Sequence, residues 1–242
     1  MTYITRRQRK ELRKKKIKQY GIGLLVVLLL CIAGVIAFKV VTKRDYSSEA
    51  TFPVYSGQPY IEVNGNVPFF TSEEMVTETF ELYSVLDDYG RCGVAYANLS
   101  KETMPTDERG EIGMVKPSGW HTVKYPDVIE DLYLYNRCHL IAWCLSGENA
   151  NEQNLITGTR YMNVEGMLPF EEQIARYLDS TGNHVLYRVT PIFEGSNLVA
   201  SGVLIEAYSV EDKGAGICFC VYCYNVQPGV EIDYKSGESS KK

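Results

Sequence analysis

Histidine is scarce in this chain of 242 residues and occurs only at positions 121, 139 and 184. A zinc module usually combines two Cys or His pairs at regular spacing, and no second pair accompanies the adjacent Cys138 and His139. Neighbours in sequence also seldom point at one ion, so the pattern argues against zinc. The residues alone leave two roles for His139, which lies in the apolar stretch LYNRCHLIAW: a buried histidine with a hydrogen-bond partner, or a catalytic group.

Positive charge is also scarce beyond the first 44 residues. Residues 45–242 contain 13 Lys or Arg against 29 Asp or Glu, a net charge of about −16. Nucleic-acid-binding domains usually present a basic surface, so this balance argues against broad nucleic-acid binding. A function on nucleic acid would require a cleft that is locally positive. The side chains expected to gather there are Arg137, Arg160, Lys116 and Lys124.

The N-terminal region has the opposite charge and leads into an apolar run. Residues 1–20 carry nine Lys or Arg and one Glu, and residues 21–38 are uncharged, a length of about 18 residues that can cross a bilayer as a helix. Basic flanks stay in the cytoplasm, so we expect a cytoplasmic tail, a transmembrane signal-anchor and an acidic domain outside the cell. A cleaved signal peptide is the alternative, but Lys39 and Lys43 stand where a small-residue cleavage site should be.

The rest of the chain is expected to form one domain on a stalk. Residues 39–60 mix Ser, Pro, Gly and charge without a period, as a linker does. Residues 61–234 hold the segments with strand or helix periodicity, and residues 235–242 form a polar tail. We find no internal repeat.

The periodicities predict an α+β domain with an antiparallel sheet and few helices. Residues 168–179 (LPFEEQIARYLD) place four apolar side chains on one helical face, with Pro169 in the first turn. Residues 132–145 begin as a strand and can continue as a helix, residues 155–162 are ambiguous, and residues 105–127 are expected to be loop. The other strand predictions are 60–70 (with an Asn-Gly turn inside it), 92–98, 184–192, 199–208 and 216–224.

Three cysteines in GICFCVYCYNV are spaced in a way that only superficially resembles a metal-ligand run. The β-branched and aromatic residues around them predict a strand. On a strand, Cys218 and Cys220 share one face and Cys223 points the other way. We therefore favour buried, small apolar side chains over a metal site or a disulfide.

Four stretches carry a resemblance to a known family. They are YNRCHLIAW, NEQNLITGTRYMNVEGMLPFEEQIARYL, TGNHVLYRVTPIF and YNVQPGVEIDY. Together they resemble the DNA/RNA non-specific endonucleases, and within them the secreted and membrane-anchored nucleases of Gram-positive bacteria, which include DNA-entry nucleases of competence. The resemblance covers roughly residues 61–234 and implies a ββα metal-binding element within the α+β fold.

The family's Asp-Arg-Gly-His signature stands here as Asn136-Arg137-Cys138-His139. The resemblance implies that His139 is the general base that activates water. Imidazole titrates at a pH of about 6.5, and a nearby Arg137 is expected to lower the pKa of His139 and keep it available as a base. Two signature positions differ, which leaves their roles open; Cys138 is expected to be a small packing residue where the family has glycine.

Downstream residues complete the implied site. Asn163, in TRYMN, matches the asparagine that binds the catalytic magnesium, and Asn154, in NEQNL, matches one that positions the substrate or supports the site. Glu171, in LPFEE, matches the acidic residue that holds a metal-bound water, with its neighbour Glu172 a weaker candidate. Mg²⁺ is therefore the implied cofactor, with Mn²⁺ able to substitute.

Phosphate binding is expected to involve arginine. Arg137 or Arg160 could clamp a phosphate through paired hydrogen bonds, and Asn136 is a further candidate for substrate binding. Contacts made mainly to phosphate would give sequence-independent binding.

The sequence thus predicts an outward-facing, membrane-anchored, magnesium-dependent endonuclease acting on DNA, with RNA as a second candidate substrate and DNA-uptake machinery as a candidate partner. One alternative is a catalytically inactive nuclease-like module for binding or scaffolding, motivated by Asn136, Cys138 and the acidic surface. Another is a thiol-dependent enzyme with Cys138 as nucleophile. It is disfavoured because catalytic Cys and His residues normally come from separate segments.

Overall fold

A computed structural model of the chain describes residues 52–242. The expected cytoplasmic tail, the expected anchor at 21–38 and most of the expected stalk lie outside the described residues. Among residues 52–242, the helices are all too short or too polar to span a bilayer.

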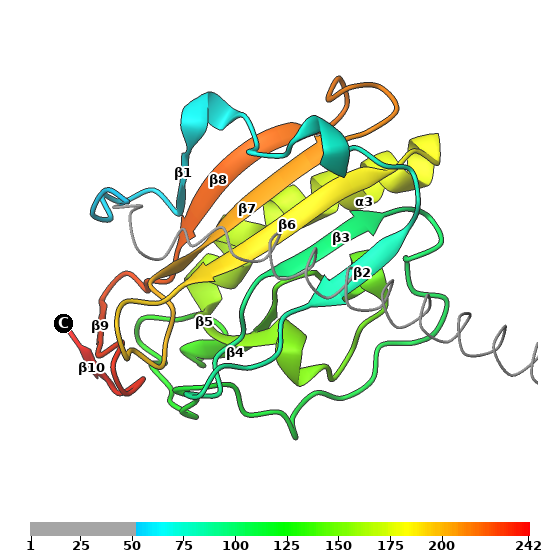
Figure 1. Ribbon diagram of the computed structural model, residues 1–242. Helices are drawn as coiled ribbons and strands as arrows, with labels where there is room; N and C mark the ends of the chain where they lie inside the picture. The colour runs from blue at the N-terminus through cyan, green and yellow to red at the C-terminus, as the bar shows by residue number, and fades with distance from the viewer. Residues whose placement is uncertain (1–51) are drawn as a thin grey trace, which may run out of the picture. The chain divides into compact units, whose positions relative to one another are not determined.

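A six-stranded sheet forms the centre of the described domain, and every neighbouring pair of strands is antiparallel (Figure 1). This confirms the expectation of a mostly antiparallel sheet with few helices. In spatial order the strands are β1 (Tyr60–Glu62), β8 (Cys218–Tyr224), β7 (Gly202–Ser209), β6 (Val185–Ile192), β3 (Ala95–Leu99) and β2 (Phe80–Tyr83).

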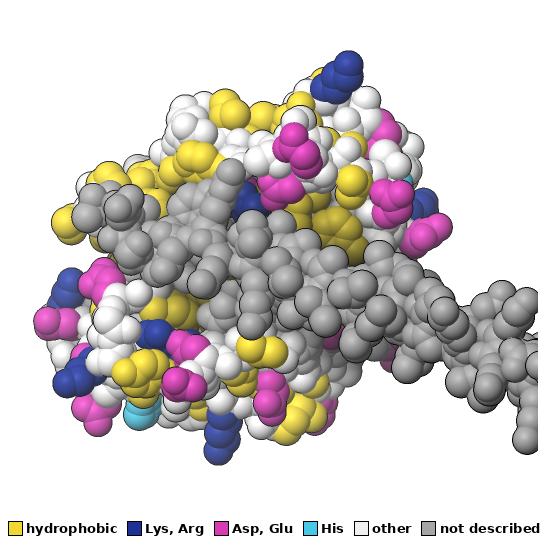
Figure 2. Space-filling model, in the orientation of Figure 1, with side chains coloured by type: hydrophobic (Ala, Val, Ile, Leu, Met, Phe, Trp, Pro, Cys, Tyr) yellow, Lys and Arg dark blue, Asp and Glu magenta, His cyan; other side chains and the backbone are white. Residues whose placement is uncertain are grey.

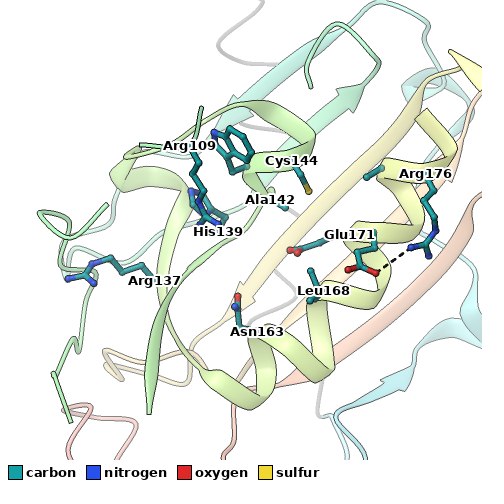
Figure 3. Close-up of a pocket in the computed structure, with 12 residues that line it drawn as sticks. Arg109, Arg137, His139, Ala142, Cys144, Asn163, Leu168, Glu171 and Arg176 are labelled. Atoms are coloured by element: carbon teal, nitrogen blue, oxygen red, sulfur yellow. Dashed lines mark hydrogen bonds and ion pairs between the residues drawn. The ribbon is translucent and has the colours of Figure 1, made fainter. Parts of the chain in front are cut away.

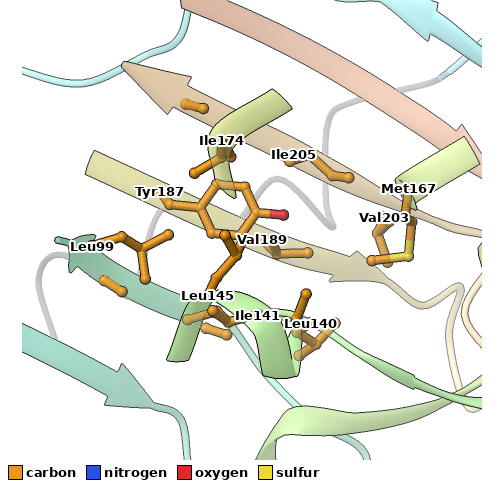
Figure 4. Close-up of a cluster of buried hydrophobic side chains, with 14 of the residues drawn as sticks. Leu99, Leu140, Ile141, Leu145, Met167, Ile174, Tyr187, Val189, Val203 and Ile205 are labelled. Atoms are coloured by element: carbon orange, nitrogen blue, oxygen red, sulfur yellow. The ribbon is translucent and has the colours of Figure 1, made fainter. Parts of the chain in front are cut away.

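One face of the sheet is covered by helix α3 (Leu168–Thr181), which runs behind the central strands in Figure 1. Side chains alternate between the faces of a strand, so β7 directs Val203 and Ile205 into the core that it shares with the buried Ile174 of α3 (Figure 4). Tyr187 of β6 lies in the same core. The apolar stripe of the helix and the inward positions of the strands therefore bury one another.

A second unit, at the end of the sheet, is a pair of antiparallel strands, β4 (Tyr135–His139) and β5 (Leu155–Thr159). A short helix, α2 (Trp143–Ser146), and a single 3-10 turn, η3 (Glu152–Asn154), lie in the connection between them. After β5 the chain passes through a π-helical turn, η4 (Met162–Met167), directly into α3. This order of strand, strand and helix matches the expected ββα element.

One prediction for the first third of the domain needs correction, because the strand expected over residues 60–70 ends at Glu62. The chain turns at η1 (Asn64–Asn66), with Asn64 and Asn66 in the left-handed region, but no second strand follows. The backbone N–H of Phe69 instead donates to the Glu206 side chain at 2.8 Å, which draws the segment across the sheet. A second 3-10 turn, η2 (Ser72–Glu74), is closed by a capping box at Thr71.

The domain also extends beyond both boundaries expected from composition. Phe52 stacks on Tyr222 with ring centroids 3.8 Å apart, and the Tyr224 hydroxyl donates to the carbonyl of Pro53. Residues 52–60 therefore belong to the folded domain rather than to a stalk. At the other end, the polar tail contributes a strand, β10 (Ser239–Lys241), that pairs with β9 (Val230–Ile232).

Cysteine placement agrees with the strand interpretation. Cys220 and Cys223 are buried on opposite faces of the sheet, whereas Cys218 is exposed at the start of β8. All six cysteines of the described residues are free thiols.

A buried ion network lies on the face of the sheet opposite α3. The Arg188 guanidinium donates to both carboxylate oxygens of Glu206 at 2.7 and 2.8 Å, and to Glu74 at 3.1 Å. Arg188 and Glu206 are 2% and 0% exposed. Because Glu206 also receives the N–H of Phe69, the network ties the irregular segment before β2 to the centre of the sheet.

Removing one member of this network should destabilise the fold. We expect Glu206→Leu to lower the free energy of unfolding by about 3–5 kcal/mol, because it leaves a buried guanidinium without its bidentate partner. The double variant Arg188→Met/Glu206→Leu should recover part of that loss. Thermal unfolding followed by near-ultraviolet circular dichroism measures both, with the exposed Glu231→Gln as control. A single variant as stable as the parent would contradict the assignment.

Candidate active site

A cavity of about 480 Å³ lies between the end of β4 and the start of α3 (Figure 3). It brings together residues that are far apart in sequence, from the loop before β4, from β4 itself, from α2, from η4 and from α3. Those the chemistry can use are Arg109, Arg137, His139, Cys144, Asn163, Glu171, Glu172 and Arg176.

His139, the last residue of β4, is buried beside this cavity and 6% exposed. Its Nε2 lies 2.8 Å from the carbonyl oxygen of Asn149. A carbonyl only accepts, so Nε2 carries a proton and Nδ1 is left with the lone pair in the neutral ring. Burial lowers the pKa of His139, and the charge of Arg109 lowers it further. The imidazole is thus held as the free base at neutral pH.

Asn163 projects into the cavity from the π-helical turn η4 (Figure 3). Such turns are rare and occur often at functional sites. The Asn163 Nδ2 donates to Oδ1 of Asn136 at 3.3 Å. This contact occupies the amide nitrogen and leaves the Asn163 side-chain oxygen as a ligand for a cation. It also gives Asn136, whose role the signature left open, a place beside the expected metal ligand.

Glu171 lies across the cavity in the first turn of α3 and is 7% exposed. Burial raises the pKa of this carboxyl to about 8, with Arg109 opposing the shift and Glu172 adding to it. Glu172 itself is exposed and pairs with Arg176 at 3.3 Å, one helical turn on. The geometry therefore favours Glu171 over Glu172 as the buried acidic group of the site.

Asn154 does not line the cavity. It is fully buried, and its amide accepts from the Ile141 N–H at 2.8 Å and donates to the Ile141 carbonyl at 2.9 Å. Of the two roles expected for it, substrate positioning and support of the site, the contacts fit the second. Asn154 thus binds the backbone just beyond His139 and lies outside the cavity, which does not match its expected place among the catalytic residues.

Arg137 lines the cavity but is anchored away from its centre. Its guanidinium donates to the carbonyls of Val115 and Gly113 and lies 4.0 Å from the ring of Trp120. The arginine that lowers the pKa of His139 is Arg109, not Arg137 as expected. Arg109 lies in a loop without periodicity, so no pattern in the sequence singled it out.

Cys138 is a packing residue. It is completely buried, and burial raises the pKa of its thiol well above the ordinary range. A Cβ built on Gly158 of the neighbouring strand would come within 3.1 Å of the Cys138 Cβ and closer still to its sulfur. The close approach of β4 and β5 therefore depends on glycine at 158. A buried thiol with a raised pKa is a poor nucleophile, which contradicts the thiol-enzyme alternative.

Positive side chains line the cavity as expected, but they are not all the residues that were expected there. Arg109, Arg137 and Arg176 line the cavity, while Lys116 and Lys124 do not and Arg160 borders a neighbouring one. Elsewhere the surface is mixed: the face of the described domain shown in Figure 2 carries acidic and basic side chains intermixed.

The donor set of the cavity suits a hard cation. Within residues 52–242, no three His, Cys, Asp or Glu side chains gather as a metal cluster. The side-chain oxygen donors that line the cavity are the amide oxygen of Asn163 and the carboxyls of Glu171 and Glu172, of which Glu172 is paired with Arg176. Mg²⁺ prefers oxygen ligands and retains several waters, so a site with one or two protein oxygens fits its chemistry.

Comparison with known proteins decides the family. The family model for DNA/RNA non-specific endonucleases matches residues 71–211, which is more than half of the chain. The chain belongs to the DNA/RNA non-specific endonuclease family. The match includes β4, β5 and α3 and therefore every residue of the cavity described above. It confirms the resemblance noted in the sequence and the assignment of the chain to this class of enzymes.

Individual relatives agree with the family. A protein named deoxyribonuclease from Streptococcus dysgalactiae subsp. equisimilis is 27% identical over 209 residues, which cover 69% of this chain and 62% of the relative. This chain thus spans less than two-thirds of the length of that relative.

Solved structures share the fold. NucA from Streptococcus agalactiae, with a magnesium ion bound, superposes with a TM-score of 0.69 at 24% identity and covers 81% of this chain and 91% of its own. The Sda1 nuclease, with a bound zinc ion, gives a TM-score of 0.63 at 25% identity over 76% of this chain and 97% of its own.

Burial of Glu171 has a measurable effect on stability. Its pKa is about 8 in the folded protein against 4.5 for an ordinary glutamate, so folding is favoured by protonation. The contribution is fully present below pH 4.5 and is lost as the pH rises toward 8. Without divalent cations, Glu171→Gln should therefore match the parent in Tm near pH 4.5 and exceed it by roughly 5 °C or more at pH 8.

Thermal unfolding in EDTA across this pH range measures the effect. The matched control is Glu231→Gln, an exposed glutamate outside the cavity, which should not reproduce the growth of the Tm difference with pH. A Tm difference for Glu171→Gln that does not grow with pH would contradict a buried, protonated carboxyl.

Proposed function

We propose that this protein is a magnesium-dependent endonuclease that hydrolyses phosphodiester bonds in DNA and, without discriminating between the sugars, in RNA. The observation that carries the proposal is the convergence of a neutral, buried imidazole, His139, with the oxygen donors Asn163 and Glu171 around one cavity. Membership of the nuclease family supports the reaction class, and the deoxyribonuclease relative supports DNA as a substrate.

His139 acts as the general base. Nε2 is held by the Asn149 carbonyl, so the proton of the attacking water passes to Nδ1. The hydrogen bond to a carbonyl also stabilises the ring once it is protonated. Asn154 contributes indirectly, because its clamp on Ile141 fixes the backbone that follows the histidine.

A bound Mg²⁺ would supply positive charge to the phosphate and the leaving oxygen, and Mn²⁺ can replace it. Asn163 would hold the ion directly, with its amide oriented by Asn136, and Glu171 would contact the hydration shell. A neutral amide ligand leaves most of the charge of the ion for the substrate. The magnesium in the NucA structure supports the choice of ion.

Arginine side chains compensate for the acidic domain. Arg109 and Arg137 border the cavity and can donate to phosphate oxygens, and Arg160 lies on the same side, next to the adjoining cavity. Contacts of this kind address the backbone of a nucleic acid rather than its bases. The protein should accordingly cut without strong sequence preference and lose affinity steeply with salt.

The alternative function is a catalytically inactive nuclease-like module at the cell surface. Asn136 and Cys138 in the signature, together with the acidic composition, motivate it. The contacts of Asn136 and Cys138, the two residues that differ from the family signature, favour an active enzyme over an inactive module. Asn136 orients Asn163, and Cys138 packs against Gly158, so both residues have places that leave the catalytic groups intact.

Plasmid digestion tests the activity. The full chain in detergent should nick and linearise plasmid DNA with Mg²⁺, should fail in EDTA, and should lose at least about 100-fold in rate in His139→Ala. The matched control is His184→Ala, a histidine paired with Glu211 away from the cavity, which should cut like the parent. No cleavage by the parent with any divalent ion would favour the inactive module. Cleavage retained by His139→Ala would remove the assigned base.

We further propose that residues 21–38 anchor the protein in the cell membrane, with the N-terminus in the cytoplasm and the nuclease domain outside. The charge asymmetry of the sequence supports this orientation. Such a location suits a role in handling extracellular DNA, with DNA-uptake machinery as a candidate partner.

Protease treatment of intact cells tests the topology. A tag placed after Lys242 should be digested from outside, while a tag before Met1 should be protected, and the full-length protein should remain in the membrane fraction after a high-salt wash. Release of a shortened, soluble protein would instead indicate cleavage of the apolar run.

A further inference from the structure

A second cavity, of about 530 Å³, adjoins the catalytic one. Arg109, Arg137 and Asn163 line both, so the two form adjoining parts of one recess on either side of the expected metal ligand. Its volume falls in the range of roughly 300–1,000 Å³ that is typical of sites for small organic groups. The side chains that line only the second cavity are Ile112, Trp120, Thr122, Tyr133, Tyr135, Asn136 and Arg160.

Three aromatic rings border this cavity, and Tyr133 is the most exposed of them. The Tyr135 ring is 3% exposed, and its hydroxyl donates to the Gly237 carbonyl at 2.9 Å. Trp120 carries the Arg137 guanidinium on its ring at 4.0 Å. Tyr133, just before β4, is 41% exposed, with the ammonium of Lys124 at 4.6 Å from its centroid. Trp120 and Tyr133 each have a cation over the ring, and the greater exposure of Tyr133 makes it the ring on which a planar group can stack.

The cavity is also cationic in an acidic domain. Arg109, Arg137 and Arg160 line it, and no carboxylate does. One carboxylate lies nearby: Asp131 forms an ion pair with Arg160, and both side chains are exposed, at 55% and 38%. Asp131 occupies the guanidinium that would otherwise be free for an anion. A phosphate that binds Arg160 must therefore compete with Asp131.

We propose that this cavity binds the nucleotide next to the scissile phosphodiester, with its base stacked on Tyr133 and its phosphate on Arg160. The proposal rests on the nuclease function proposed above and names a substrate subsite for it. Bases of any kind have a π-face, so stacking of this sort tolerates every sequence. A base can reach Tyr133 only after leaving its own stack, so the subsite takes an unpaired nucleotide and leaves duplex binding to the phosphate contacts.

Asp131 has a defined part in this arrangement. It pre-orients Arg160 in the free protein but opposes the incoming phosphate by charge and by competition for the same N–H groups. Removing the carboxylate without changing its size should thus strengthen binding. If Asp131 had only a structural role, replacing it should instead weaken binding of the nucleic acid.

Fluorescence anisotropy tests the subsite in the full chain in detergent, with Mg²⁺ and the His139→Ala background to prevent cleavage. The probes are a labelled single-stranded oligodeoxynucleotide of about 12 nucleotides and the same sequence as a duplex. Added to that background, Tyr133→Ala should weaken single-strand binding roughly 5- to 100-fold and leave duplex binding within about 2-fold. Tyr133→Phe should bind like the background protein, because the ring remains.

The other variants complete the test. Asp131→Asn should tighten binding of both probes severalfold, and Arg160→Gln should weaken both. The matched control is Tyr89→Ala: Tyr89 is 53% exposed and has the Arg91 guanidinium at 4.9 Å from its ring, but it lies outside both cavities. It should bind like the background protein. Thermal unfolding of each variant checks that the fold is kept.

Equal binding by Tyr133→Ala and the background protein, equal losses on both probes, or weaker binding by Asp131→Asn would overturn the subsite. These outcomes leave the nuclease proposal intact if the parent still cuts plasmid DNA in a His139-dependent manner. A parent that neither cuts plasmid DNA nor, in the His139→Ala form, binds either probe overturns the proposed function and the subsite with it.

Discussion

The close pairing of β4 with β5 is the constraint on which the site depends. A side chain at position 158 would overlap the Cys138 sulfur, so the two strands can approach this closely only with glycine there. At the end of β4, Asn154 binds both backbone groups of Ile141 and fixes the chain that follows His139. The position of the imidazole beside the cavity thus depends on strand pairing, on the hydrogen bonds of Asn154 and on the hydrogen bond of its own Nε2 to the Asn149 carbonyl.

Burial shifts the pKa values of His139 and Glu171 in opposite directions, and each shift favours the uncharged form of the group. It lowers the pKa of His139, which keeps the ring neutral, and raises the pKa of Glu171 to about 8, which keeps the carboxyl protonated until a cation or a base displaces the proton. Arg109 favours the neutral imidazole and the charged carboxylate at the same time. A buried carboxyl of this kind reduces the stability of the protein at neutral pH, and such costs are common where function requires a strained or desolvated group.

Sequence periodicity located most of the regular structure. The helix expected over residues 168–179 is α3 with two more residues, and the three strands expected after it are β6, β7 and β8, each within a few residues of its predicted start. These elements bury one face against another, so their apolar side chains recur at the period of the backbone. Strands β2, β9 and β10 were missed because they are short and lie at edges, where few positions are buried.

In the site, too, some features could be predicted from the sequence and others could not. The family resemblance in the sequence pointed to His139, Asn163 and Glu171, and the fold brings these three residues to one cavity. The charge of Arg109, the supporting rather than catalytic position of Asn154, and the recess beside the catalytic cavity depended on loops that only tertiary packing brings together. Local sequence determines which faces are apolar and which groups can react; the distances between segments far apart in the chain, and hence the pKa values and cavities they create, are decided by the fold.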